Sequence, residues 1–322
     1  MTLDADSITA KRRLRRSLAF WRVLAVLALA AAVAAVLLAE TTAIGGLSQR
    51  ADHIARVKVS GLITGDEDTL ELLQKIEKVN RVKAVLVRID SPGGTTAGSE
   101  ALYLALRQLG EKKPVVAVMD TVAASGGYIT AIAADHIVAR GNTITGSVGV
   151  LFQWAQVQEL LETLGIDMES IKSGDLKAEP NFFEPMSDKA RQVTQAMVAD
   201  SFRWFLGLVE ERRQLSAAEV SLISDGRVFT GRQAVVARLV DEIGGEAEAK
   251  AWLTANRKIS ADLEIVDWKV ASGLGDGGLG FAVTRAILSA LGFGEGSWLL
   301  EKIAAQERLS VDGLISVWHP DS

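Results

Sequence analysis

Short apolar runs rich in β-branched residues alternate with helical patterns through the middle of this 322-residue chain, and this alternation limits its fold more than any other feature. Four runs have the length and composition of buried strands: 54–64, 82–90, 113–119 and 135–140. The segments 69–79 and 99–109, and the residues after Ser125, have the apolar spacing of helices. Strand-then-helix order predicts an α/β domain with a largely parallel sheet. In such sheets, binding and catalytic groups gather beyond the carboxyl ends of the strands.

Glycine pairs follow two of the predicted strands. DSPGG (90–94) comes after the second run, and AASGGY (123–128) comes after the third. Glycine lets the backbone turn tightly and point bare N–H groups at a ligand, which an oxyanion hole requires. Either motif alone is more often a turn or a helix cap, but their occurrence on successive strand ends favours a site. Ser125, in the second motif, is therefore either a helix cap or a nucleophile.

A serine nucleophile needs a base, and no histidine of this chain is convincing in that role. His53 precedes the first strand, His136 lies in an apolar strand pattern that favours a structural role, and His319 is close to the end. The chain has no cysteine, so thiol catalysis is excluded. A lysine can act as the base when it is neutral, a state that burial in an apolar pocket favours. The downstream candidates are Lys172, Lys177 and Lys189.

An uncharged apolar run of 17 residues, 23–39, precedes the α/β region. As a helix at ~1.5 Å per residue it spans roughly 25 Å, which is just enough to cross a bilayer. Five basic residues stand at 11–16, so the positive-inside rule predicts a cytoplasmic N-terminus and a main body on the other side of the membrane. A cleaved signal peptide is the alternative, although the run is longer than the usual signal core.

The chain has a net charge of −5 despite the basic cluster near its N-terminus. No basic stripe occurs outside that cluster, so we expect no binding of nucleic acid. No spacing of the His-Glu-x-x-His kind is present, and we expect neither a metal nor another cofactor.

Residues 186–216 have the apolar spacing of a long helix, and Ser216 to Glu219 has the pattern of a capping box that opens the next helix. Three apolar residues of the long helix are expected in a core or an interface: Phe202, Phe205 and Leu208. The glycine-rich stretch 272–280 is expected to be a linker, and the residues after it an amphipathic helix pair.

Five motifs in one order resemble the signal peptide peptidase family of the bacterial SppA type, over roughly residues 50–250. They are DSPGG, AASGGY, GNTITGSVGV (141–150), SGDLKAEPNFFEPMS (173–187) and DGRVFTGRQAVVARLVDEIGG (225–245). The resemblance implies an α/β fold of the Clp-protease/crotonase-like type with repeated ββα units, preceded by one N-terminal transmembrane helix. The expected parts are a basic cytoplasmic N-terminus at 1–22, an anchor at 23–39, a peptidase domain at 50–250 and a C-terminal extension of unknown role at 251–322.

The resemblance also implies site residues, by position within these motifs. Ser125 matches the nucleophile, Lys177 the general base, and Ser147 the serine that orients the lysine amine. The oxyanion-hole donors would be the main-chain N–H groups of Gly126 and of either Gly93 or Gly94.

The function implied by the resemblance is that of a membrane-anchored serine endopeptidase, which degrades cleaved signal peptides and other apolar peptides through an acyl-enzyme. It implies one pass through the bacterial inner membrane, with the catalytic domain on the periplasmic side. It further implies a ring-shaped homo-oligomer in which each chain supplies both Ser125 and Lys177. Two alternatives stay open: an acyl-CoA hydratase or thioesterase of the same fold, and an inactive membrane scaffold.

Overall fold

The structure, a computed structural model, describes residues 21, 51–270 and 315–317. The chain divides into two units, residues 1–52 and 53–322, and the second contains the sheet. No helix within the described residues is long and apolar enough to cross a membrane. The predicted anchor at 23–39 lies outside the described residues, as do the linker at 272–280 and the helix pair expected after it.

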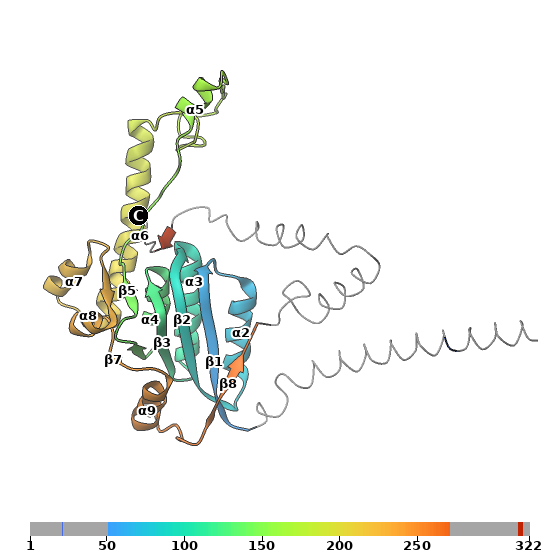
Figure 1. Ribbon diagram of the computed structural model, residues 1–322, viewed down its shortest axis with the longest axis vertical. Coiled ribbons are helices and arrows are strands. Elements are labelled where there is room, and N and C mark those ends of the chain that lie inside the picture. Colours follow the sequence, from blue (N-terminus) through green and yellow to red (C-terminus); the bar gives the residue numbers. More distant parts are fainter. Residues whose placement is uncertain (1–20, 22–50, 271–314, 318–322) are drawn as a thin grey trace, which may run out of the picture. The chain divides into compact units, whose positions relative to one another are not determined.

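One mixed sheet forms the centre of the second unit (Figure 1). Its strands are β1 (His53–Ile63), β2 (Val82–Thr95), β3 (Val115–Ala124), β4 (His136–Ala139), β5 (Ile144–Gly146), β6 (Val228–Thr230), β7 (Glu242–Ile243), β8 (Glu264–Trp268) and β9 (Ile315–Val317). The order is β6-β5-β3-β2-β1-β8, with β4 beside β3, β7 beside β4, and β9 beside β2. The pairs are parallel except where β6 meets β5 and β9 meets β2. The predicted α/β class with a largely parallel sheet is therefore confirmed.

Helices cover both faces of the sheet. The helices of the described residues are α2 (Glu67–Lys78), α3 (Thr96–Gly110), α4 (Gly126–Ile132), α5 (Gln158–Thr163), α6 (Asp188–Arg213), α7 (Ala217–Ile223), α8 (Gly231–Val236) and α9 (Glu246–Arg257), and of these α5 stands away from the sheet. Successive residues of β2 face opposite sides of the sheet because the strand is pleated. Val85 and Val87 join the core formed with α2, α3, α4 and α6, whereas Leu86 joins a smaller core under α9.

The predicted strands and helices are found close to the expected ranges. From β1 to α4, single strands and single helices alternate, and β4 with β5 is the first place where two strands follow each other. That half of the domain is therefore not a repetition of ββα units. Two elements beyond residue 250, β8 and β9, belong to the same sheet.

The predicted long helix is α6, and the capping box after it is confirmed. The Ser216 hydroxyl accepts the N–H of Glu219 at 3.4 Å, and the Glu219 carboxylate accepts the N–H of Ser216 at 2.7 Å. Within α6, Phe205 is fully buried. Phe202 and Leu208 are partly buried, as expected for residues of a core or an interface.

Residues 151–187, here named the arm, stand at the N-terminal end of α6 and carry α5 away from the sheet (Figure 1). A hydrogen bond from the N–H of Val157 to the carbonyl of Phe182, 2.9 Å long, closes its base. Every hydrogen bond and ion pair described for residues 158–185 ends within residues 157–189. The arm is thus held by its own contacts and by the start of α6.

Candidate functional site

Ser125 lies between the end of β3 and the first residue of α4 and is 1% exposed. Its φ of 54° and ψ of −115° belong to a region that glycine dominates, at the first central position of a type II′ turn. A residue held in such a sparsely populated region is strained by roughly 1–3 kcal/mol. Its side chain makes no capping hydrogen bond to α4. Ser125 is therefore not a side-chain cap, and a strained serine in a sharp strand-to-helix turn has the geometry of a nucleophile elbow.

An irregularity in the pairing of β2 and β3 directs the chain into this turn. Ile89 of β2 pairs with Met119 of β3. The next pair joins Ser91 to Ala123, so β3 has two more residues than β2 over this interval. Such bulges bend a strand and are common beside active sites, where they re-aim a side chain.

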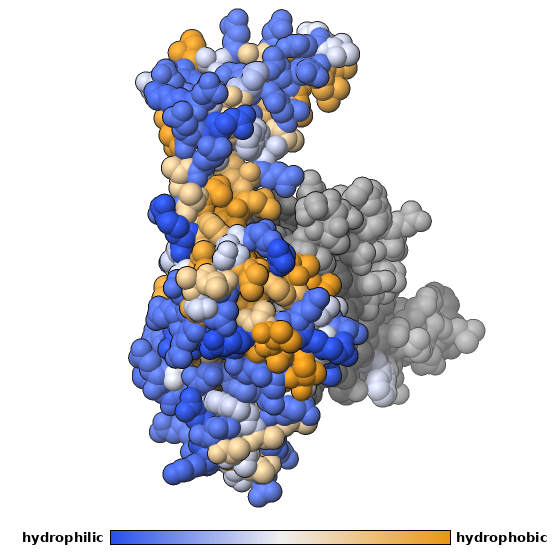
Figure 2. Space-filling view, turned by 90° about the vertical axis from the view of Figure 1, so that its left-hand side faces the viewer, coloured by the Kyte–Doolittle hydropathy of each residue, from blue (hydrophilic) through white to orange (hydrophobic). Residues whose placement is uncertain are grey.

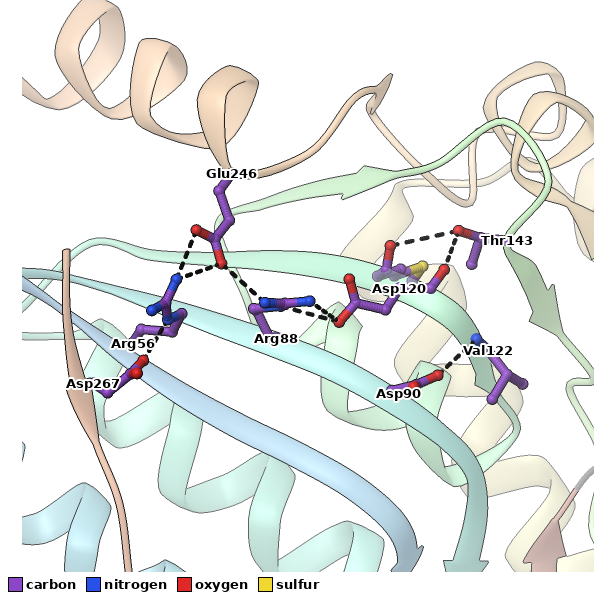
Figure 3. A network of polar contacts seen from close by, with 9 residues as sticks. Arg56, Arg88, Asp90, Asp120, Val122, Thr143, Glu246 and Asp267 are labelled. Carbon is purple, nitrogen blue, oxygen red and sulfur yellow. Dashed lines mark hydrogen bonds and ion pairs between the residues drawn. The ribbon is translucent and has the colours of Figure 1, made fainter.

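Four polar side chains hold the bulged part of β3 (Figure 3). Asp90 accepts the N–H of Val122 at 3.2 Å. The Thr143 hydroxyl donates to the carbonyl of Asp120 at 2.6 Å, while the Asp120 carboxylate accepts two hydrogen bonds from Arg88, at 2.8 and 3.0 Å. Buried or partly buried polar contacts of this kind fix the backbone of the bulge because leaving them unmade is costly.

The SPGG loop at the end of β2 is held from inside by Ser91. The Ser91 hydroxyl, which is fully buried, donates to the carbonyl of Gly61 at 2.6 Å and accepts the N–H of Gly93 at 3.1 Å. Gly93 has a φ of +117°, and a Cβ on Gly94 would lie 1.8 Å from the carbonyl oxygen of Ile63. Neither position therefore accommodates a side chain without strain or a clash.

The two glycine loops meet, as their places on successive strand ends predict. A Cβ on Gly127 would lie 2.6 Å from the carbonyl oxygen of Ser91, so the start of α4 rests directly on the end of β2. Gly126 is the first residue of α4, and the first N–H groups of a helix have no partner within it. Its N–H is therefore suited to hold an oxyanion beside Ser125.

Ser147 follows β5, the strand beside the end of β3. Ala124 pairs with Gly146, and the N–H of Ser125 donates to the Gly146 carbonyl at 2.8 Å. Since neighbouring strands lie ~4.8 Å apart, the two serines leave the sheet next to each other. Ser147 also has a positive φ, 52°, and its N–H donates to the carbonyl of Arg227 at 2.9 Å. The structure therefore brings Ser125 and Ser147 together.

Lys177, by contrast, is not brought to these serines within one chain. It lies in an exposed turn of the arm, and its side chain has no hydrogen-bond or ion-pair partner among the described residues. Asp175, two residues earlier, pairs with Lys189 at the start of α6 at 3.4 Å. Phe205 of α6, which is packed in the core with α4, lies 16 residues further on, or about 24 Å along the helix axis. The described contacts of the arm therefore do not connect Lys177 with the Ser125 turn of the same chain.

The other lysines are less suited to act as the base. Lys172 forms ion pairs with Glu179 at 2.8 Å and with Glu184 at 3.0 Å, and these hydrogen bonds raise its pKa. Burial lowers the pKa of Lys113. However, Lys113 precedes β3, whereas Ser125 follows it, and a strand of this length spans roughly 30 Å. Lys172 is held in two ion pairs and Lys113 lies at the opposite end of β3 from Ser125, so neither is well placed to act as the base.

The two histidines in the described residues have structural contacts. The indole N–H of Trp268 donates to His53 at 3.1 Å, and the rings are stacked. His136 shares a hydrogen bond with Glu242 at 2.8 Å and stacks on Trp252 with 4.6 Å between ring centroids. The structural role predicted for His136 is confirmed. His319 lies outside the described residues.

A groove of about 880 Å³ opens beside Ser147. It lies between the chain that leaves β5, the N-terminal half of α6 and the loop before β6. Figure 2 views this side of the molecule and shows hydrophobic residues gathered in the middle of the face, below the arm. The main apolar side chains of the lining are Val148, Val150, Phe152, Trp154, Val198 and Phe202. A concave, mostly apolar lining with a few polar groups is typical of a ligand site.

Two positioning residues, Ser91 and Asp90, were not singled out from the sequence. Both stand in the DSPGG motif, which was interpreted only through its glycines. A polar residue directly before a glycine pair at a strand end is the signal that could have found them, because such a loop needs internal hydrogen bonds when it is buried.

Known proteins resemble this chain over most of the described part. Residues 107–260 match the family model described as Peptidase family S49. A protein of Synechocystis sp. whose name describes a protease is 39% identical over 201 residues, which are 62% of this chain and 72% of that protein. Protease 4 of Haemophilus influenzae is 34% identical over 231 residues, 68% of this chain and 37% of its own length. A protein of Enterococcus faecium named for signal peptide peptidase SppA is 30% identical over 282 residues, 82% of this chain and 76% of its own.

Proposed function

Because the chain belongs to peptidase family S49, as its motif order predicts, we propose that it is a membrane-anchored serine endopeptidase of the Clp-protease/crotonase-like fold, with Ser125 as nucleophile. The observation that carries the proposal is the backbone of Ser125. The residue is buried, has a φ of 54° and makes no side-chain capping bond. Strain of this kind persists where the surrounding structure holds it, and it concentrates at active sites.

In the proposed mechanism a neutral lysine takes the hydroxyl proton of Ser125, and the oxygen attacks a peptide carbonyl. The C–N bond then breaks, the amine leaves with that proton, and water hydrolyses the acyl-enzyme. The N–H of Gly126 supports the tetrahedral oxyanion. Since the N–H of Gly93 is donated to Ser91, the second donor is more simply assigned to Gly94. Ser147, beside Ser125, orients the lysine amine.

The geometry favours Lys177 of a neighbouring copy as the base, in place of the same-chain pair that the sequence led us to expect. Lys177 stands on an exposed arm, and the hydrogen bonds and ion pairs described for residues 158–185 all end within residues 157–189. The arm also exposes large apolar side chains, namely Leu160, Leu164, Met168, Ile171, Phe182 and Phe183. Exposed apolar surface of this kind marks an interaction site. In a ring with head-to-tail contacts each arm would reach the next copy.

Mixing two inactive variants tests this arrangement. Ser125→Ala and Lys177→Ala chains are co-expressed and assayed on an apolar peptide. When a neighbour supplies the base, about one quarter of the sites in a random ring combine an intact serine with an intact lysine. Activity should therefore return to about that fraction of wild type. If the dyad lies in one chain, no mixture is active. A Ser125→Ala chain mixed with a Ser125→Ala/Lys177→Ala chain is the control and stays inactive.

The class of substrate is proposed from the apolar groove beside Ser147 and from the relative named for signal peptide peptidase. We expect cleaved signal peptides and other apolar peptides. Parallel assays with such peptides and with acyl-CoA esters decide between a peptidase and a hydratase or thioesterase. A fluorophosphonate label that reacts with wild type but not with Ser125→Ala excludes an inactive scaffold.

The proposed topology follows from the apolar run 23–39 and the basic residues before it. The catalytic domain is placed on the periplasmic side of the bacterial inner membrane. In untreated cells the domain should be found in the membrane fraction. Protease added to intact spheroplasts should digest it. Protection of the domain in intact spheroplasts would refute this orientation.

A further inference from the structure

The strand that leads to the proposed nucleophile changes its partners shortly before it ends. On one side, β3 pairs with β4 as far as Met119 and with β5 from Val122 onward. On the other side, its register with β2 steps from Met119 to Ala123. Asp120 and Thr121, here named the unpaired stretch, therefore have no partner residue on any strand of the described part of the chain. Where the strand pairing is interrupted in this way, a strand bends.

Side chains hold the unpaired stretch where strand pairing does not. The carboxylate of Asp120 is only 13% exposed, and its Oδ2 atom accepts hydrogen bonds from both Nε and Nη2 of Arg88 on β2. Two donors of one rigid, planar guanidinium fix the direction of the carboxylate as well as its distance. The Asp120 carbonyl is held separately by the hydroxyl of Thr143. Arg88 is therefore the contact that ties this stretch to β2.

Arg88 is itself held on its other side by Glu246, the first residue of α9. A carboxylate oxygen of Glu246 lies 3.5 Å from Nη1 of Arg88. The same carboxylate accepts hydrogen bonds from Arg56 at 2.9 and 3.0 Å, and Arg56 also pairs with Asp267 of β8. Figure 3 shows these side chains in one row of alternating charge, which crosses β8, β1, β2 and β3 and ends at the unpaired stretch. An isolated exposed ion pair contributes little, whereas a network of several charges can hold its members in place.

We propose that Arg88 is a positioning residue for Ser125. It fixes the carboxylate of Asp120, and with it the bend of β3 from which the Ser125 turn starts five residues later. A serine with a φ of 54° keeps that conformation only where the surrounding structure holds it. The effect of Arg88 on catalysis rests on the peptidase function proposed above, whereas its effect on the turn does not.

A comparison of stabilities measures the hold on the turn without using activity. Alanine at position 125 keeps the strain of the positive φ and glycine relieves it. The difference between the urea midpoints of Ser125→Gly and Ser125→Ala therefore reports how firmly the turn is held. In full-length chains that also carry Arg88→Met, this difference should fall to less than half or change sign. Arg203→Met is the matched control, because it removes only the exposed ion pair with Asp200 on α6, and it should leave the difference unchanged.

A second variant, Asp120→Ala, tests whether Arg88 acts through Asp120. It should reduce the difference between the two midpoints as much as Arg88→Met does, and the two changes together should reduce it no further. Additive effects would overturn the proposed route through Asp120. An undiminished difference in both single variants would overturn the proposal as a whole, and so would the absence of any difference before they are introduced.

A kinetic test separates positioning from a purely structural role. Arg88→Met should lower kcat for an apolar peptide ~10-fold or more with little change in KM, because a displacement of ~1 Å at a reacting group can cost up to ~100-fold in rate. The rate at which a fluorophosphonate labels Ser125 should fall by a similar factor. Arg88→Lys keeps a charged donor without the rigid fork and should recover part of both rates.

The outcomes of the kinetic test are distinguishable from a failure of the proposed function. Wild-type kcat and labelling rate in Arg88→Met would overturn the proposal for Arg88. If no chain, wild type included, cleaves a peptide or takes up the label, the proposed peptidase function fails. The comparison of urea midpoints then still decides whether Arg88 holds the Ser125 turn.

Discussion

Replacing Ser125 by glycine and by alanine separates backbone strain from capping. Both variants lack the hydroxyl, so the difference between them reports on the backbone alone. At the φ of 54° and ψ of −115° found here, alanine keeps the strain of roughly 1–3 kcal/mol and glycine removes it. Glycine in turn loses more conformational entropy on folding, about 0.5–1 kcal/mol. The glycine variant should therefore be more stable than the alanine variant by about 0.5–2 kcal/mol.

The order of stabilities is the informative result, because at ordinary helix or strand positions it is reversed. Urea unfolding followed by tryptophan fluorescence measures the free energy of unfolding of each full-length variant. Ala131→Gly is the matched control: Ala131 is fully buried in the last turn of α4, and glycine there should cost about 1 kcal/mol. Both Ser125 variants should lack peptidase activity. If the glycine variant is less stable than the alanine variant, Ser125 is not strained and the argument for a nucleophile elbow fails.

Three further predictions concern the base, the packing of the glycine loops and the loss of stability at acid pH. Lys177→Arg should fold normally and lose nearly all kcat/KM, because a guanidinium does not give up its proton; activity near wild type would exclude Lys177 as the base. Gly127→Ala should lower the free energy of unfolding by roughly 1–3 kcal/mol, measured in urea, because its Cβ would meet a carbonyl oxygen at 2.6 Å; an unchanged value would show that the loops are not in close contact. The hydrogen bond from the backbone of Ser216 is the main cause that lowers the pKa of Glu219 from 4.5 to about 2, so its stabilising effect is complete above pH 4.5 and is lost as the pH falls toward 2. Glu219→Gln should therefore show a smaller fall in Tm between pH 6 and pH 3 than wild type does, whereas Glu100→Gln, on an exposed position of α3, should show the wild-type fall.

Local patterns in the sequence predicted the longer elements of this fold. The β-branched runs became β1 to β4, and the amphipathic segments became α2, α3 and α6. The capping box at Ser216 formed as its spacing predicts. These features are predictable because they depend on residues within one or two turns of each other, where periodicity and capping decide the conformation. The meeting of the two glycine loops was also predictable, since carboxyl ends of parallel strands share one edge of a sheet.

Distances between remote residues depend on the tertiary structure alone. Ser147 follows Ser125 by 22 residues and Lys177 follows it by 52, but this spacing does not say that the first lies on the neighbouring strand and the second on an arm. Ser147 is placed by the pairing of β5 with β3. Lys177 is placed by an arm whose hydrogen bonds remain within itself and the start of α6.

The dependence on tertiary structure also explains why the strand in the C-terminal region was not predicted. Its sequence predicted only an extension of unknown role, because a strand of three residues has no periodicity from which to recognise it. Ile315–Val317 becomes a strand through its partner, the free edge left where β3 turns into Ser125. The sequence by itself predicted the longer strands and helices up to α6, and it named the residues proposed to carry the chemistry. The tertiary structure decided which of these residues meet, because pairing partners are selected by packing and by free hydrogen-bonding edges that lie far apart along the chain.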